Sequence, residues 1–151
     1  MRFLIFLVFI FYINPSYSAT DDWTSYGKGS GGGHFSKADE ITPENVKKLE
    51  IVWVHRSGDY KGGANSAGVK GGEYQTSFQA TPLLVDDTLL YCTSYNRVFA
   101  LDPETGKEKW VFDPKLKKDG RAILACRGLS SWKDETKSSS EKCHHRIMGV
   151  T

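Results

Sequence analysis

The sequence has no strong excess of charge of either sign and no apolar stretch long enough to cross a membrane. Its 20 Lys and Arg residues stand against 18 Asp and Glu, and this balance excludes the strongly basic surface by which proteins bind nucleic acid. The longest apolar run, Phe3–Ile13, has eleven residues, whereas a membrane-spanning helix needs about 20. No glycine loop ends in Gly-Lys-Ser or Gly-Lys-Thr, because Gly33 is followed by His34, and this excludes a Walker-type phosphate loop.

The N-terminus has the pattern of a secretory signal. Arg2 precedes the apolar run, Asn14-Pro15 ends it, and the small residues of Ser16-Tyr17-Ser18 suit a cleavage site. We therefore predict a signal peptide over residues 1–18, with an uncleaved anchor as the alternative. Residues 19–151 would then be exported to a compartment in which disulfides persist.

Three cysteines allow one disulfide in three pairings. Cys92 lies in the apolar run Leu89–Cys92, where a buried, inert thiol is the usual outcome. Cys126 and Cys143 flank a polar loop, and we predict that these two are bridged, although the residues leave the other two pairings open.

The first part of the exported chain has weak secondary-structure signals. Thr42 as a cap and Pro43 at the first helical position predict a short helix that extends to Leu49. Alternating side chains predict a strand over Ile51–His55, with Ile51, Trp53 and His55 on one face. The composition of Gly58–Gly72 predicts an exposed loop.

A regular pattern of short strands and tight turns begins at Pro82. The predicted strands are Leu83–Val85, Leu89–Tyr91, Arg97–Leu101 and Lys107–Phe112, and the clearest turn is Asp102–Gly106. Four strands in about 30 residues without an intervening helix favour an all-β fold built on an antiparallel meander and argue against a parallel α/β sheet.

Such a meander is the repeating unit of a β-propeller, and one blade cannot cover both of its own faces. The smallest propellers need roughly 160 residues, more than the 133 that follow the predicted signal. Residues 146–151 also read as a strand without a closing turn. We therefore expect this chain to be the N-terminal piece of a longer protein.

Four segments resemble one known family, the quinoprotein dehydrogenases that carry pyrroloquinoline quinone (PQQ). The segment Ala100–Trp110 resembles their tryptophan-docking repeat, and Phe78–Pro82 resembles the approach to their first full blade. The segment Cys126–Ser130, followed by Cys143 and Arg146-Ile147, resembles the glucose/quinate/shikimate branch. The family's N-terminal signature is similar to Asp22-Trp23, Tyr26-Gly27, Phe35-Ser36 and Ile41–Val46.

The resemblance implies an all-β chain that forms the N-terminal part of an eight-bladed β-propeller, with PQQ and calcium on its axis. It places Arg127 where the family has an arginine that pairs with PQQ, and a guanidinium suits the carboxylates of that cofactor. Gln79 falls near the cofactor's rim, where its amide could donate and accept. The catalytic residues and the calcium ligands are expected beyond Thr151, so no metal ligand is predicted in this chain.

Three features depart from particular branches of the family. Ile123-Leu124-Ala125 stands where the methanol and ethanol branch has two adjacent cysteines, and Trp132 stands where glucose-oxidising relatives often have His. Membrane-bound glucose dehydrogenases begin with several membrane helices, for which this sequence has only a signal-like segment. The pair His144-His145 does not predict a metal site, because adjacent residues of an extended segment point to opposite faces, and we expect both rings to be solvated.

The sequence thus leads to one functional hypothesis and one alternative. The hypothesis is part of an exported, periplasmic PQQ-dependent dehydrogenase that oxidises a small alcohol or polyol, such as a sugar or a quinate-like compound, and is inactive as a fragment. The electrons would go to a quinone or another respiratory acceptor, and a peripheral association with the outer face of the inner membrane is compatible with this. The alternative is a cofactor-free β-propeller that serves as a protein-binding scaffold of the cell envelope.

Overall fold

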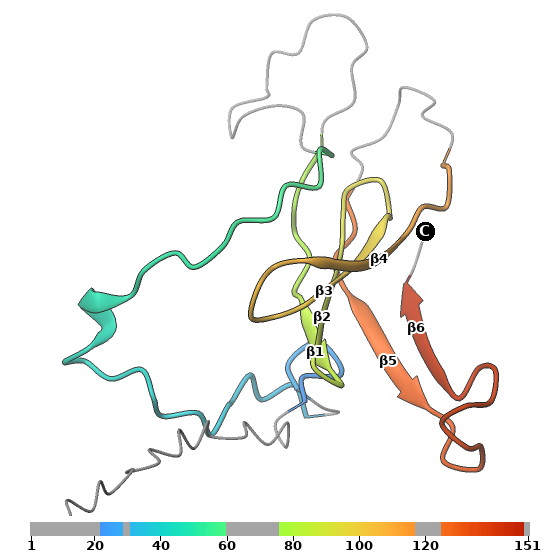
Figure 1. Ribbon diagram of the computed structural model, residues 1–151, viewed down its shortest axis with the longest axis horizontal. Helices are drawn as coiled ribbons and strands as arrows, with labels where there is room; N and C mark the ends of the chain where they lie inside the picture. The colour runs from blue at the N-terminus through green and yellow to red at the C-terminus, as the bar shows by residue number, and fades with distance from the viewer. Residues whose placement is uncertain (1–21, 29–30, 60–75, 117–124, 150–151) are drawn as a thin grey trace, which may run out of the picture.

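The computed structural model of the protein describes residues 22–28, 31–59, 76–116 and 125–149 (Figure 1). The predicted signal peptide and nearly all of the predicted loop Gly58–Gly72 lie outside these residues. Within the described part of the chain, no helix is long and apolar enough to cross a membrane. Strands dominate the secondary structure, as the sequence predicts.

The centre of the molecule is a four-stranded antiparallel sheet in the order β1-β2-β3-β4. The strands are β1 (Leu83–Val85), β2 (Thr88–Cys92), β3 (Val98–Leu101) and β4 (Glu108–Phe112). Each lies within about a residue of its predicted bounds, so the predicted meander is confirmed. Asp86 and Asp87 join β1 to β2 with φ of 46° and 52°, the left-handed backbone that a two-residue hairpin turn requires.

The turn between β3 and β4 is held by one carboxylate. Asp102 Oδ1 accepts hydrogen bonds from the backbone N–H of Glu104 (3.1 Å) and from the backbone N–H and hydroxyl of Thr105 (both 2.8 Å). Gly106 ends the turn with φ of 70°, and the ring of Trp53 covers it so closely that no Cβ would fit there. The predicted turn Asp102–Gly106 is therefore confirmed in its chemistry as well as in its place.

A second, two-stranded sheet follows. It consists of β5 (Leu129–Lys133) and β6 (His145–Gly149), paired antiparallel from Leu129↔Gly149 to Lys133↔His145. In Figure 1 this hairpin, in orange and red, lies beside the four-stranded sheet. The final strand predicted over residues 146–151 is present as far as the description reaches, which is Gly149.

The four-stranded sheet has apolar side chains on both faces, because neighbouring residues of a strand point in opposite directions. On one face Leu90 and Cys92 of β2 belong to a buried cluster that includes Leu129 of β5. On the other face Tyr91 and Phe99 pack with Trp53 from the segment before the sheet. The hairpin thus covers part of one face and the end of segment 31–59 covers part of the other, while β4 is exposed along its whole length.

The predicted helix near Pro43 is shorter than expected. One 3₁₀ turn, η1 (Val46–Lys48), follows Asn45, which occupies the N-cap position that we expected for Thr42. The Asn45 side chain is used elsewhere: its Oδ1 accepts from the Thr42 N–H (2.8 Å) and its amide donates to the Glu40 carbonyl (2.6 Å). Because η1 buries no residue, no packing favours a longer helix.

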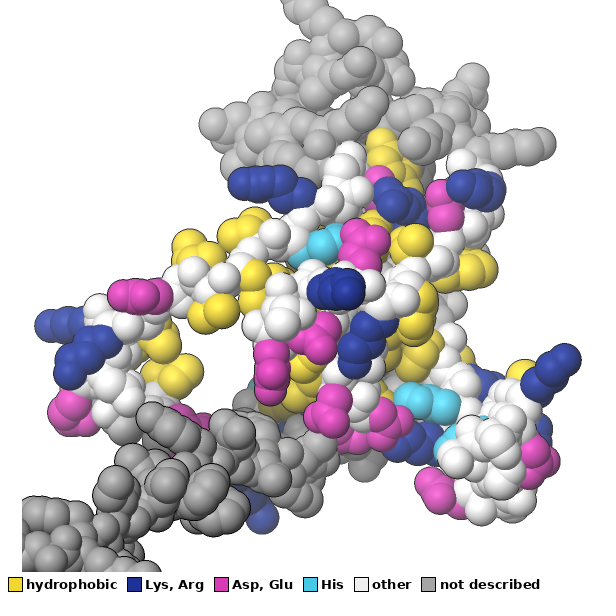
Figure 2. All heavy atoms as spheres, viewed as in Figure 1, with side chains coloured by type: hydrophobic (Ala, Val, Ile, Leu, Met, Phe, Trp, Pro, Cys, Tyr) yellow, Lys and Arg dark blue, Asp and Glu magenta, His cyan; other side chains and the backbone are white. Residues whose placement is uncertain are grey.

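The predicted strand Ile51–His55 is extended but has no strand partner among the described residues. Its alternation is partly right, since Trp53 and His55 turn toward the sheet, while Val52 is 84% exposed. Ile51, expected on the face of Trp53, is instead 83% exposed, because the chain reaches the sheet only after this residue. In Figures 1 and 2 the preceding part of the segment projects away from the sheet with hydrophobic side chains on its surface.

The predicted Cys126–Cys143 disulfide is wrong. The bridge joins Cys92 to Cys126, whose Cα atoms are 5.9 Å apart, and Cys143 is exposed and free. The β5–β6 register explains this, because Cys126 precedes β5 at the open end of the hairpin and Cys143 lies at the turn end. The length of β5 alone separates these ends by about 13 Å, whereas a disulfide requires a Cα separation of about 4.4–6.8 Å.

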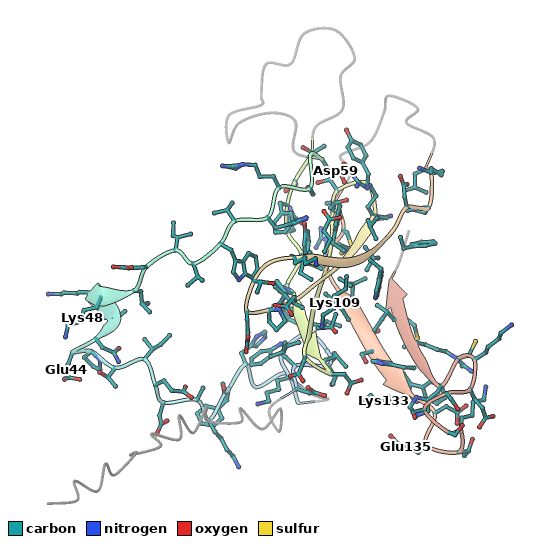
Figure 3. The ribbon with its side chains drawn as sticks, in the orientation of Figure 1. Glu44, Lys48, Asp59, Lys109, Lys133 and Glu135 are labelled. Carbon is teal, nitrogen blue, oxygen red and sulfur yellow. A yellow bond between two sulfur atoms is a disulfide. The ribbon has the colours of Figure 1, made fainter. Side chains whose placement is uncertain are left out.

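Lysine side chains tie the strands to the β1–β2 turn. The Lys109 ammonium of β4 donates to the Asp87 carbonyl (2.6 Å) and to the Thr88 hydroxyl (3.1 Å). The Lys133 ammonium of β5 contacts an Asp86 carboxylate oxygen at 2.6 Å, and this hydrogen bond is the main cause of a raised Lys133 pKa. The two lysines, labelled in Figure 3, therefore connect β4 and β5 to the same turn.

Candidate functional site

The structure brings Gln79 and Arg127, 48 positions apart in the sequence, to the wall of one hollow. The hollow has a volume of about 570 Å³ and lies at the open end of the β5–β6 hairpin. Its wall combines a few polar groups with apolar side chains. The lining residues are Tyr26, Gln79, Arg127, Gly128, Leu129, Ser130, Met148 and Gly149.

Two segments that run side by side set the positions of these two residues. The chain that leads into β1 carries Gln79, and the chain that leads into β5 carries Arg127. Thr81 forms a parallel bridge with Gly128, and its N–H donates to the Arg127 carbonyl at 3.4 Å. The main chain therefore places the two side chains on the same hollow before either binds anything.

The Gln79 side chain is oriented by the residues beside it. Its amide nitrogen donates to the Ser77 hydroxyl at 2.9 Å, and the Ser77 carbonyl accepts from the Ser94 hydroxyl at 3.0 Å. This bond uses one of the two amide N–H groups and fixes the direction of the amide, and the carbonyl oxygen of Gln79 can act as an acceptor at the rim.

Arg127 combines a fixed backbone with an unpartnered head group. Its side chain is exposed, and within the described part of the chain no carboxylate or carbonyl lies within hydrogen-bond distance of the guanidinium. A guanidinium presents five N–H donors in a planar fork that matches a carboxylate. This end of the hollow can therefore bind a carboxylate or another oxyanion.

The N-terminal residues form a further part of the wall, which sequence reasoning missed. Trp23 pairs with Leu84 of β1 through backbone hydrogen bonds of 2.7 and 3.1 Å, and the Ser131 N–H donates to the Thr24 carbonyl at 2.9 Å. These bonds bring Tyr26 to the hollow, whose wall also includes Met148 of β6. Tyr26 stands in the segment that resembles the family's N-terminal signature, but nothing in the sequence places it or Met148 at the hollow, because only the pairing of three distant segments brings them together.

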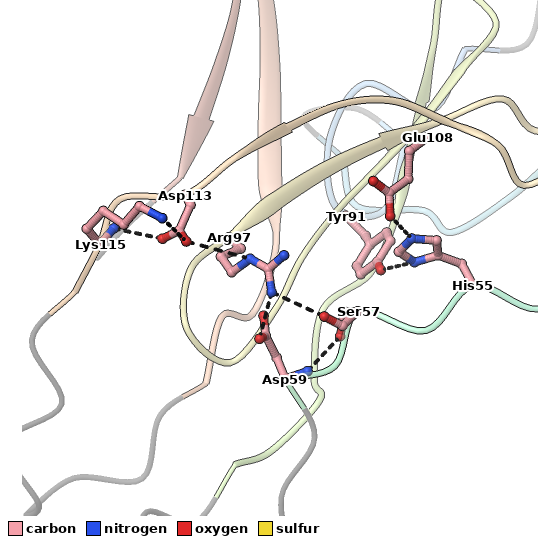
Figure 4. Close-up of polar contacts among 8 residues, drawn as sticks. All are labelled: His55, Ser57, Asp59, Tyr91, Arg97, Glu108, Asp113 and Lys115. Carbon is pink, nitrogen blue, oxygen red and sulfur yellow. Dashed lines mark hydrogen bonds and ion pairs between the residues drawn. The ribbon is translucent and has the colours of Figure 1, made fainter.

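A second polar cluster lies on the other face of the sheet (Figure 4). His55 contacts the Tyr91 hydroxyl through Nδ1 (2.5 Å) and Glu108 Oε1 through Nε2 (2.8 Å). Burial, reinforced by the negative charges of Glu108 and Asp59, raises the pKa of Tyr91 to about 12. These three side chains fasten the segment that ends at Asp59 to the sheet and do not line the hollow.

Arg97, immediately before β3, holds the same segment further along. Its guanidinium donates to Asp59 Oδ1 (2.9 Å) and to the Ser57 carbonyl (3.1 Å), and it lies over the Phe99 ring. Asp113 approaches it at 4.0 Å, and a hydrogen bond from Lys115 is the main cause of the lowered Asp113 pKa. Arg97 thus differs from Arg127, because its charge already has protein partners.

His145, predicted to be solvated, is instead engaged by neighbouring side chains. Its Nε2 contacts the Ser131 hydroxyl at 2.7 Å, and its Nδ1 lies 3.4 Å from an Asp86 carboxylate oxygen. Next to it, the Arg146 guanidinium lies over the ring of Trp132, which is half-exposed. Among the described residues, no three His, Cys, Asp or Glu side chains gather in a way that could hold a metal ion.

The comparisons with known proteins agree on one family. The family model described as "PQQ: Glucose/ethanol/alcohol dehydrogenase, beta-propeller domain" matches residues 23–151. The chain is 35% identical over 142 residues to quinoprotein glucose dehydrogenase A of Acinetobacter calcoaceticus and 37% identical over 135 residues to quinoprotein glucose dehydrogenase of Escherichia coli K12. Each alignment covers 86% of this chain, but only 17% and 16% of the relative.

A third relative is quinate/shikimate dehydrogenase (quinone) of Acinetobacter baylyi. It is 35% identical over 109 residues, which are 72% of this chain and 12% of the relative. The chain therefore spans about one sixth or less of the length of each of these three proteins.

Proposed function

We propose that this chain, which belongs to the β-propeller family of PQQ-dependent glucose, ethanol and alcohol dehydrogenases, is the N-terminal part of an exported enzyme of that kind. The enzyme oxidises a polyol, a sugar or a quinate-like alcohol and passes the electrons to a quinone or another respiratory acceptor. This chain contributes part of the cofactor site and is inactive without the remainder of the enzyme.

The observation that carries this proposal is the hollow that Gln79 and Arg127 share. PQQ is a flat molecule with three carboxylates, and each carboxylate that loses water on binding needs a compensating partner. The Arg127 guanidinium, which has no partner in the described protein, meets that need, and the Gln79 carbonyl offers an acceptor. The apolar groups of Leu129, Met148 and Tyr26 suit the ring system.

When bound, PQQ supplies the two-electron acceptor that no protein side chain provides. The role of this chain is to bind the cofactor through the charge of its carboxylates and to exclude water from the side of the cofactor that faces the hollow. Calcium, which is typical of the family, would be held by residues beyond Thr151, as would the base that removes the substrate's hydroxyl proton.

The names of the relatives support the substrate class. Two relatives are glucose dehydrogenases, and the third acts on quinate or shikimate with a quinone as acceptor. All of these substrates are compounds with several hydroxyl groups. Because the relatives are dehydrogenases, the comparisons favour this function over a cofactor-free scaffold.

The proposal includes the architecture of the enzyme and its location in the cell. An eight-bladed propeller provides neighbouring blades for the faces that the present sheets leave open, and Trp110, 45% exposed on β4, docks on one of them. The signal-like residues 1–18 support export to the periplasm, where the enzyme associates peripherally with the outer face of the inner membrane.

Reconstitution of the complete apoprotein tests this function. We expect PQQ with calcium to confer reduction of an artificial electron acceptor in the presence of glucose, glycerol or quinate, and we expect no activity from residues 19–151 alone. The scaffold would instead be supported if the protein bound an envelope protein tightly but neither bound PQQ nor showed PQQ-dependent activity with any of the three substrates.

A further inference from the structure

The residue immediately before Arg127 is one end of the Cys92–Cys126 disulfide. Both half-cystines are buried, with exposures of 1% for Cys92 and 4% for Cys126. Cys92 ends β2, a central strand that pairs with β1 on one side and β3 on the other. The bridge therefore joins the segment that carries Arg127 to one of the two central strands of the sheet.

The residues that follow Arg127 are held by non-covalent contacts. Gly128 bridges to Thr81, and Leu129 is buried in the cluster that also contains both half-cystines. Arg127 is thus fixed on one side by a covalent bond and on the other by a backbone pair and a packed side chain. Its own guanidinium, unpartnered in the described protein, contributes nothing to this anchoring.

We propose that Cys92 and Cys126 are positioning residues: their disulfide holds the Arg127 backbone where the guanidinium meets a carboxylate of PQQ. This inference rests on the proposed function. A long side chain binds an anion with less loss of conformational freedom when its backbone is already fixed. The bridge therefore contributes to cofactor affinity through Arg127 rather than through a contact of its own.

A double-mutant cycle on the complete apoprotein tests the inference. PQQ is titrated in calcium into four proteins: the parent, Arg127→Ala, the disulfide-free Cys92→Ala/Cys126→Ala, and the combination of all three changes. We expect the dissociation constant of PQQ to rise by about tenfold for Arg127→Ala and by about fivefold without the disulfide. In the disulfide-free protein, we expect Arg127→Ala to raise it by less than about threefold more.

Two controls separate positioning from loss of stability. Cys143→Ser also removes a cysteine but leaves the bridge, and it should bind PQQ like the parent. Val85→Ala weakens the same buried cluster without touching the disulfide, and it should leave the effect of Arg127→Ala at about tenfold. If Cys92→Ala/Cys126→Ala fails to fold, Cys92→Val/Cys126→Ala refills the core and takes its place in the cycle.

Hydrogen exchange of the apoproteins gives a readout that does not depend on the cofactor. We expect the Thr81 amide, which donates to the Arg127 carbonyl, to exchange faster without the disulfide but not in Cys143→Ser. An undiminished effect of Arg127→Ala in the disulfide-free protein overturns this inference and leaves the proposed function standing. The absence of any effect of Arg127→Ala in the parent overturns the cofactor role of Arg127 and, with it, the inference.

Discussion

Gly106 is a position at which the structure tolerates no side chain without strain. Its φ of 70° is unfavourable for a residue with a side chain, and a Cβ would lie 2.5 Å from Cδ2 of Trp53. The Trp53 ring cannot easily give way, because its Nε1 donates to the Pro103 carbonyl at 3.0 Å. Strain and overlap both act on the turn that joins β3 to β4.

We therefore expect Gly106→Ala to lower the local opening free energy of the β3–β4 turn by about 2–4 kcal/mol. Hydrogen exchange of the Asp102 amide, which donates to the Lys107 carbonyl, measures this energy in the complete protein. Gly33→Ala is the matched control, because a Cβ there meets nothing within 4 Å. Equal protection of the Asp102 amide in both variants would show that the turn absorbs the side chain without strain.

Tyr91 gives a pH dependence in the alkaline range. Its pKa rises from 10 in the unfolded chain to about 12 in the folded protein, chiefly because the phenol is buried. The folded state thus holds the proton after the unfolded state has released it. The resulting stabilisation is complete below pH 10 and is lost as the pH rises through about 12.

Absorbance at 295 nm follows this ionisation directly. We expect one tyrosine to ionise at about pH 12, later than an ordinary tyrosine, and this late step to be missing in Tyr91→Phe. The variant should also lose less stability than the parent between pH 10 and 12. A parent titration without a late step would contradict the burial of this phenol in solution.

The candidate site shows which residues a sequence can reveal. Arg127 and Gln79 stand in segments with recognisable motifs, so their convergence could be anticipated from a family resemblance. Tyr26 also stands in a segment that resembles the family, but the resemblance gives it no role, and Met148 has no such signal; only backbone pairing brings the two to the hollow. The Cys92–Cys126 bridge is not predicted from the sequence, because the apolar neighbours of Cys92 suit a buried free thiol and a buried half-cystine equally well.

At the scale of elements, the β1–β2 hairpin depends on a turn with two left-handed residues, neither of them glycine. Asp87, in the second position, has φ of 52° and is exposed. Aspartate tolerates this backbone, but glycine adopts it without steric cost. Asp86, in the first position, should be kept because it pairs with Lys133.

We expect Asp87→Gly to raise the opening free energy of the hairpin by about 0.5–1 kcal/mol, since relief of the strain exceeds the added freedom of the unfolded chain. Hydrogen exchange of the Val85 and Thr88 amides in the complete protein provides the measurement. Asp86→Gly is the informative control, because it relaxes the same backbone but loses the contact with Lys133, and it should gain less. Faster exchange in Asp87→Gly than in the parent would refute this account.

The strands from β1 to β4 could be predicted because their determinants are local. Alternating apolar residues and strong turn residues at Asp86-Asp87 and Asp102–Gly106 lie within a few positions of the strands that they define. The segment Ile51–His55 lacks such determinants. Whether an extended segment becomes a strand depends on a partner, and none is present among the described residues. The 3₁₀ turn η1 is likewise short because nothing packs against it.

At the scale of the whole molecule, the described chain leaves hydrophobic groups on open faces. Trp110, Val111 and Phe112 of β4 are 45%, 46% and 58% exposed. Trp110 and Phe112 also line a groove between the two sheets. An exposed apolar strand of this kind tends to bind another chain.

We therefore expect isolated residues 19–151 to associate or to fold poorly. Sedimentation velocity should show species that grow with protein concentration, and Trp110→Gln/Phe112→Gln should reduce this growth. Lys107→Gln, an exposed change next to the same strand, is the control and should not reduce it. A monomer that melts cooperatively would show that these faces need no neighbouring blade.

The central claim is that Arg127 binds a carboxylate of PQQ in the complete enzyme, and a titration of three apoproteins in calcium tests it most directly. The parent, Arg127→Lys and Arg127→Ala are compared at equal concentrations of folded protein. Lysine keeps the charge but loses the fork, and alanine loses both, so affinity should fall in that order. We expect the alanine variant to bind PQQ at least about tenfold more weakly, which corresponds to about 1.4 kcal/mol. Equal affinity of the alanine variant and the parent would contradict the claim and leave Arg127 without a role in binding the cofactor.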